Sequence, residues 1–261
     1  MNRIVPMVGA EFLKLRRRRG LVLLSLFLVA GSVVVVNAVM VAYHASNAVK
    51  YPPAGGVDGF NHSLTLFGVV AALAAVLIGA TAGAQDTSSG VFRSLVATGQ
   101  SRIALALVRI PGALMLLLPM LALGYGLAVL AAFTLASGMP TPTGVDVLSG
   151  AGWLLAIGVL DLTVALGLGA LVQSRGTAIG LMIAWELAGS RLLERVGAFG
   201  GWRQLASTVA TDRFLPRATD TVKLGQIDSI TITLGAAVAV VVAWIVISTV
   251  LGAWRTATQD A

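Results

Sequence analysis

The sequence predicts an all-α integral membrane protein with six transmembrane helices. Apolar residues make up 57% of the 261 residues and charged residues only 11%, and the mean hydropathy is +0.91. A soluble domain carries about 25% charged residues, so this chain has too few polar side chains to cover a water-soluble globule. Six apolar helices of roughly 20 residues use about 120 residues, which leaves room for loops but not for a second folded domain. We therefore expect residues 1–261 to form a single transmembrane domain.

The first expected element is an amphipathic helix that precedes the spans. Within residues 1–20, Ile4, Val8 and Phe12 recur at helical spacing, while Lys14 and four consecutive arginines supply a polar face. A helix of this kind lies in the membrane interface, with its basic side chains near anionic headgroups. Membrane lipids are therefore expected partners of the chain.

Six apolar stretches follow, bounded by polar or turn-forming residues. The expected spans are residues 21–43, 63–84, 106–136, 152–172, 177–190 and 230–253. The connection 85–102 is expected to be a cytoplasmic loop. The segment 189–229 is too polar to cross the bilayer, and its middle part, Trp202–Phe214, is typical of an interfacial helix. Pro111 is expected to kink the start of the third span.

The distribution of Lys and Arg predicts the orientation of the spans. Six basic residues precede the first span, whereas the loop 44–62 contains one and the loop 137–151 contains none. Basic residues gather on the cytoplasmic side, so both termini are expected in the cytoplasm. The segment 189–229 contains six basic residues, which the same rule would place in the cytoplasm. With an even number of spans, however, this segment must lie outside the cell. If the fifth span did not cross, the C-terminus would change sides.

Several classes of function are excluded by what the sequence lacks. The net charge of +7 arises from basic residues that flank apolar segments, so lipid headgroups explain it better than nucleic acid does. There is no cysteine, none of the three lysines follows a glycine as a P-loop requires, and His44 and His62 form no metalloprotease motif. We expect no catalytic residue, no metal site and no cofactor in this chain. Abundant Ala, Gly, Val and Arg favour a bacterial source, and hence the inner membrane of a bacterial cell.

The loop between the second and third spans reads QDTSSGVFRSLVATGQSR and predicts a short amphipathic helix. Asp86 or Thr87 is expected to cap its N-terminus, and Ser101 is expected to cap the next helix. Apolar side chains one turn apart, including Phe92 and Leu95, give the helix an apolar face. This composition fits a helix that docks on a protein partner, and it equally fits a helix that rests on the lipid surface.

Two short motifs and the order of the spans resemble the membrane subunit of an ATP-binding-cassette exporter of the ABC-2 family. The basic sequence EFLKLRR precedes the first span, and the loop 85–102 combines an acidic residue, Gly90, Arg93, Leu95 and a final Ser-Arg pair. The resemblance covers the whole chain in architecture and only these two stretches in motif. Family members often have proline where Gly99 or Gln100 stands here.

The resemblance implies a permease that forms the translocation pathway and is driven by a separate ATPase. Two copies of an ABC ATPase would bind ATP and Mg, and a second permease copy or a homologous permease would complete the complex. The loop 85–102 would be a coupling helix in a groove of the ATPase, and the N-terminal helix would be an elbow that touches the same partner. The residues implied in ATPase contact are Glu11, Lys14, Asp86, Phe92, Arg93 and Leu95.

Polar residues within or near the spans are the remaining candidates. Asp161 lies near the middle of the fourth span, where a carboxylate costs about 2.5–3.5 kcal/mol on insertion scales. It must face protein or water, either as a pathway residue or as a helix-packing residue. Asn37 and Glu186 are, like Asp161, candidate pathway or helix-packing residues. Asn37 is expected to form a hydrogen bond across helices, and Glu186 and Arg191 are more typical of interfacial anchors. Arg109 is close enough to the cytosol for its guanidinium to reach water.

Gly79 and Gly83 form a G-x-x-x-G pattern that permits close approach of two helices. Two other functions stay open. The chain could be a membrane anchor or immunity-type protein that binds a toxic peptide without transport. It could also be a secondary transporter, although that class needs more midplane ionisable residues and an inverted repeat.

Overall fold

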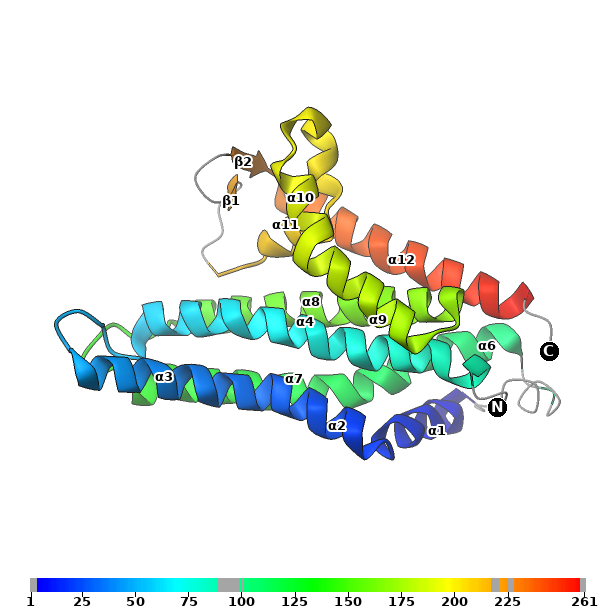
Figure 1. The fold of residues 1–261 in the computed structure, drawn as a ribbon, viewed down its shortest axis with the longest axis horizontal. Coiled ribbons are helices and arrows are strands. Elements are labelled where there is room, and N and C mark those ends of the chain that lie inside the picture. Colours follow the sequence, from blue (N-terminus) through cyan, green and yellow to red (C-terminus); the bar gives the residue numbers. More distant parts are fainter. Residues whose placement is uncertain (1–3, 89–98, 100, 217–220, 225–227, 259–261) are drawn as a thin grey trace.

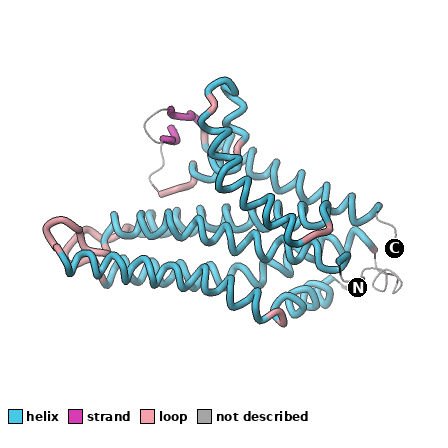
Figure 2. The backbone as a smooth tube through the Cα atoms, in the orientation of Figure 1, coloured by secondary structure: helices cyan, strands magenta, loops and turns pink. Residues whose placement is uncertain are grey.

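The computed structural model describes residues 4–88, 99, 101–216, 221–224 and 228–258, and almost all of them are helical (Figures 1 and 2). Five helical stretches are long and apolar enough to cross a membrane, which indicates a multi-pass membrane protein and confirms the all-α class. They are Arg19–Ser46, Gly56–Gln85, Arg102–Thr134, Gly144–Val172 and Leu234–Thr258. The described part of the chain also contains a short antiparallel hairpin, formed by β1 (Thr221–Leu224) and β2 (Asp228–Thr231).

The N-terminal helix and the first span form two connected elements. Helix α1 (Ile4–Arg16) is followed by a short break, and the first span then comprises α2 (Arg19–Leu26), the π-helical turn η1 (Phe27–Gly31) and α3 (Ser32–Ser46). The amide of Asn37 donates to the carbonyl of Val33 at 2.9 Å, within α3 itself. Among the described residues Asn37 forms no hydrogen bond to another helix, so the structure differs from that expectation.

The centre of the molecule is a close contact between α4 (Gly56–Ser88) and α8 (Gly144–Val172). A Cβ added at Gly79 would lie 2.2 Å from the carbonyl oxygen of Leu162, and one at Gly83 would lie 2.1 Å from that of Leu166. The G-x-x-x-G pattern therefore does form a helix–helix seam, as predicted. On the other side of α8, a Cβ at Gly167 would lie 2.4 Å from the carbonyl oxygen of Ser248, in α12 (Leu234–Thr258).

The third crossing is formed by two helices, α6 (Arg102–Leu107) and α7 (Arg109–Thr134), which meet at Val108. The break lies three residues before Pro111. Proline has no backbone N–H to donate to the preceding turn, and its ring clashes with the carbonyl group four residues earlier, so the helix is interrupted there. Ser101 caps α6 as predicted, since its hydroxyl accepts from the backbone N–H of Ala104 at 3.5 Å.

The start of the loop 85–102 differs from the expectation. Asp86 and Thr87 do not cap a new helix, because α4 continues to Ser88 through a stretch without glycine or proline. Phe92, Arg93 and Leu95, the other expected coupling residues of this loop, lie outside the described residues.

The expected fifth span, 177–190, is not among the five membrane-length helices. Helix α9 (Arg175–Ala184) has only ten residues, and the π-helical turn η2 (Trp185–Gly189) and α10 (Ser190–Arg195) that continue it carry Glu186, Arg191 and Arg195. The prediction of six spans is wrong because the apolar part is too short for the bilayer. The expected helix Trp202–Phe214 is also divided, into a 3₁₀ helix η3 (Gly197–Leu205) and α11 (Ser207–Asp212).

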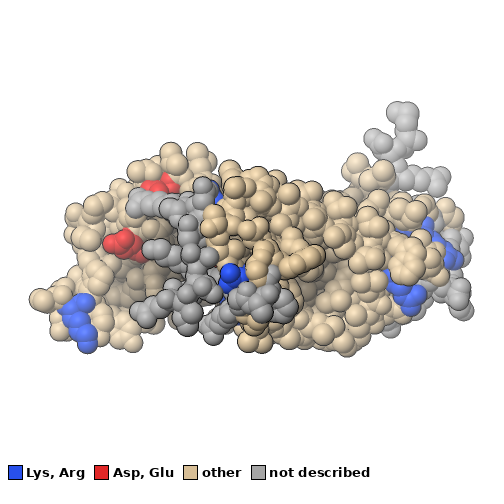
Figure 3. Space-filling model, turned by 90° about the horizontal axis from the view of Figure 1, so that it is seen from above, with Lys and Arg blue, Asp and Glu red and all other residues tan. Residues whose placement is uncertain are grey.

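Although one crossing is missing, α1 begins and α12 ends at the same end of the molecule (Figure 1). Helices α9 and α10 run back along part of the bundle and rise away from it, and α12 then runs in the direction of α8 (Figure 1). The guanidinium of Arg102, at the start of α6, donates to the carbonyl of Ala257 at 3.3 Å. Basic side chains also gather at this end on the face shown in Figure 3. The expected change of side for the C-terminus does not follow from the loss of the fifth span.

Candidate functional site

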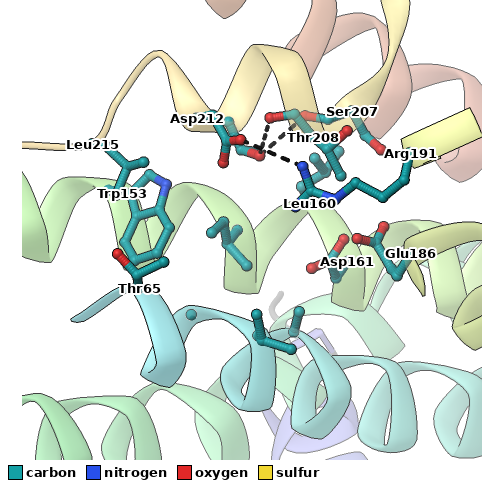
Figure 4. Close-up of a pocket in the computed structure, with 15 residues that line it drawn as sticks. Thr65, Trp153, Leu160, Asp161, Glu186, Arg191, Ser207, Thr208, Asp212 and Leu215 are labelled. Carbon is teal, nitrogen blue, oxygen red and sulfur yellow. Dashed lines mark hydrogen bonds and ion pairs between the residues drawn. The ribbon is translucent and has the colours of Figure 1, made fainter. Parts of the chain in front are cut away.

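A polar cavity of about 140 Å³ lies beside the middle of α8 (Figure 4). Helices α4 and α8 form one wall, and the segment from η2 to α11 forms the other. Thr65 and Val69 of α4 are exposed and belong to the lining, so the cavity opens at the outer face of that helix.

The α8 wall carries a buried carboxylate. Asp161 is 5% exposed and points into the cavity, where the carboxyl group of Glu186 lies beside it (Figure 4). Glu186 reaches this position from η2, where it is partly exposed and its carboxyl group faces the cavity.

The opposite wall is held by polar interactions between η2, α10 and α11. Arg191 of α10 pairs with Asp212 of α11 at an N–O distance of 3.9 Å. The indole N–H of Trp185 donates to the hydroxyl of Ser207 at 3.2 Å, and the hydroxyl of Thr211 donates to the carbonyl of Ser207 at 3.1 Å. Arg191 was expected at the interface, but here it serves as the cation of an ion pair at the cavity.

The remaining lining is apolar and closely packed. Trp153 is 3% exposed, and a Cβ added at Gly68 would lie 2.2 Å from its ring. Glycine at position 68 therefore lets the edge of the indole ring contact α4. Ala72 and Ile157 continue this apolar surface. The cavity thus combines an aromatic and aliphatic part with a carboxylate pair.

A second polar cluster lies where α1 packs against α7, at the end shared by α6 and α12. Glu11 is 7% exposed and pairs with Lys14 at 2.5 Å. A Cβ added at Gly112 of α7 would lie 2.6 Å from the Cβ of Glu11, so this glycine permits the close contact. Arg109 is only 2% exposed and donates to the carbonyl of Gly83 at 3.3 Å. The expectation that Arg109 reaches water is wrong.

The structure brings together some of the expected residues and separates others. Asp161 and Glu186 meet in the cavity, whereas Asn37 lies in α3 and Asp86 lies in the last turns of α4. Asp212 was not predicted as a site residue, and no pattern in the sequence STVATD of α11 distinguishes it. Among the described residues, no group of three or more His, Cys, Asp and Glu side chains is placed to hold a metal ion.

Neither a protein-family model nor a curated protein sequence matches this chain. The fold and the cavity together define its class, a multi-pass membrane protein with an acidic cavity beside its central helix pair.

Proposed function

We propose that this chain is the permease subunit of an ATP-driven exporter in a bacterial inner membrane, with both termini in the cytoplasm. The arrangement of one end of the bundle carries the proposal. There α1 packs against the first turns of α7, and the end of α4 and the start of α6 flank the expected coupling loop. An interfacial helix and a coupling loop at the same end offer a single surface to an ATPase.

The rest of the chain fits the same proposal. Five long helices together with the partial return of α9 and α10 would form half of a pathway, which a second copy or a homologous permease completes. Two ATPase chains would bind ATP and Mg, because this sequence has no P-loop. The permease itself would carry out no chemical step. It would transmit the motion of the ATPase to the spans.

The test of this function is recovery of the ATPase with the full-length, affinity-tagged chain from its native membrane. We expect a P-loop ATPase to co-purify in equal amount and to hydrolyse ATP in the reconstituted complex. Recovery of the chain without any such ATPase, from membranes in which the ATPase is expressed, would contradict the proposal.

The coupling loop provides a sharper prediction within that experiment. Phe92→Ala or Leu95→Asp should weaken ATPase recovery, since loss of one buried anchor costs about 2 kcal/mol, or about 30-fold in affinity. The aspartate should have the larger effect because it also buries an unpaired charge. A helix that only rests on lipid predicts undiminished recovery with both variants, which would refute the assignment. Membrane insertion of both variants should match that of the wild type.

The orientation can be tested with single cysteines, because the native chain contains none. An impermeant thiol reagent added outside intact cells should label cysteines placed at Ser149 and Ser229 and should leave one at Ser88 unlabelled. Permeabilised cells should give labelling at all three positions. Labelling at position 88 in intact cells would reverse the orientation.

A further inference from the structure

The polar cavity contains more negative than positive charge. Its lining contains three carboxyl groups, those of Asp161, Glu186 and Asp212, and one guanidinium, that of Arg191. Arg191 pairs with Asp212, and Asp161 and Glu186 lie side by side. Two neighbouring carboxylates away from bulk water repel each other strongly, because the low dielectric increases the Coulomb energy. The site therefore favours an added positive charge.

Among the described residues, Asp161 has no oppositely charged partner. It is 5% exposed and points into the cavity, and in the described part of the chain no side chain donates to it or pairs with it. A buried carboxylate normally pairs with a cation or accepts hydrogen bonds, since an unpaired one costs several kcal/mol. A buried carboxylate avoids this cost by taking up a proton or by pairing with a cation, and the cavity in front of Asp161 gives a cation room to bind.

The size and lining of the cavity restrict that ligand. A cavity of about 150 Å³ holds a molecule the size of benzene, and this cavity measures about 140 Å³. Trp153, Ile157 and Ala72 give it an apolar part, which suits a ring or a short alkyl group and not a hydrated ion. A divalent metal would need further oxygen or nitrogen ligands, and the described residues offer no group of three acidic or histidine side chains.

We propose that the cavity binds a small organic cation, a protonated primary amine attached to an apolar group about the size of a phenyl ring. The ammonium would donate hydrogen bonds to Asp161 and Glu186, and the apolar group would lie against the lining formed by Trp153, Ile157 and Ala72. Binding requires no ATPase, so this inference stands apart from the transport function. If the chain both binds the amine and acts as an exporter permease, organic amines of this kind are the class of molecule that it exports.

The experiment uses the purified full-length chain in lipid nanodiscs, with benzylammonium as the probe and isothermal calorimetry as the measurement. Benzyl alcohol has the same ring and no charge, and nanodiscs without protein correct for partition into lipid. We expect benzylammonium to bind at least about tenfold more tightly than benzyl alcohol, because hydrogen bonds to charged groups are the stronger ones. Equal affinity for the two compounds, or no saturable binding of benzylammonium, would overturn the proposal.

Two nearly isosteric variants locate the site. Asp161→Asn and Glu186→Gln should each reduce benzylammonium affinity about tenfold or more and should leave benzyl alcohol unaffected. Asp58→Asn is the matched control, because Asp58 is an exposed carboxylate in the first turn of α4, outside the cavity lining. Unchanged affinity in both cavity variants would refute the site even if the wild type binds the amine. The comparison of the two compounds on the wild type remains decisive should one variant fail to fold.

Discussion

Replacing Gly83 with alanine should lower the melting temperature of the purified protein by about 10 °C. The added methyl would lie 2.1 Å from the carbonyl oxygen of Leu166, and this atom belongs to the backbone of a membrane-length helix. A side chain could turn away, but α8 cannot, so α4 and α8 must move apart along their seam. Overpacking of this kind costs about 3 kcal/mol, and each kcal/mol corresponds to about 2–4 °C in a chain of this size.

The matched control for this prediction is Gly152→Ala. Gly152 lies within α8, and a Cβ added there meets nothing within 4 Å. Alanine is favoured over glycine inside a helix by about 0.5–1 kcal/mol, so the melting temperature should stay the same or rise slightly. Thermal unfolding followed by size-exclusion chromatography in one detergent measures both variants. A similar melting temperature for Gly83→Ala and the wild type would show that α4 and α8 are not in backbone contact at this point.

Arg109→Ala should produce a loss of similar size, about 3 kcal/mol. The guanidinium of Arg109 is almost completely buried and donates to the carbonyl of Gly83 across the contact of α7 with α4. Truncation leaves a cavity and a carbonyl without this donor, and both effects destabilise. Arg109→Lys should recover only part of the loss, because a lysine ammonium cannot present the planar donor pattern of a guanidinium.

Arg17→Ala is the control for that variant, since Arg17 is exposed between α1 and α2 near the same end. This substitution should change the free energy of unfolding by no more than about 0.5 kcal/mol, so the melting temperature should stay nearly the same. Because Arg109 donates to the carbonyl of Gly83, the Gly83→Ala and Arg109→Ala losses should not add in the double variant. Full additivity would indicate that the two sites are energetically separate.

The sequence predicted the long helices well because a membrane span is a local property. An apolar stretch of about 20 residues must form a helix in lipid, whatever it packs against. The close helix contact at Gly79 and Gly83 could also be predicted from the local sequence, because it requires only two small residues one turn apart. The fifth span failed because the apolar part of α9 is followed by Glu186 and Arg191, and the balance between crossing and turning back depends on partners elsewhere in the chain.

The cavity could be predicted only in part, for the same reason. Asp161 could be recognised as a candidate from the sequence alone, since placing a carboxylate inside a membrane span costs free energy. Its position beside Glu186 depends on the π turn η2, and the pairing of Arg191 with Asp212 depends on how η3 and α11 fold back. No local pattern encodes these long-range arrangements. The burial of Arg109 is similar, because the acceptor comes from α4, 26 positions earlier in the sequence.

The backbone contact between α4 and α8 has a mechanical consequence. Where Gly79 and Gly83 meet carbonyl groups of α8, no flexible side chain lies between the two helices to absorb a displacement, and at Gly68 the ring of Trp153 fills the contact. The two helices therefore behave as one stiff lever. Twenty residues of such a lever span about 30 Å, enough to carry a push applied at the Ser88 end of α4 as far as Gly68. The opposite wall of the cavity is linked by the Arg191–Asp212 pair and the Trp185–Ser207 hydrogen bond, which are easily deformed. Strain entering along α4 would therefore change the shape of the cavity at its compliant side, while the wall that carries Asp161 moves as a rigid unit.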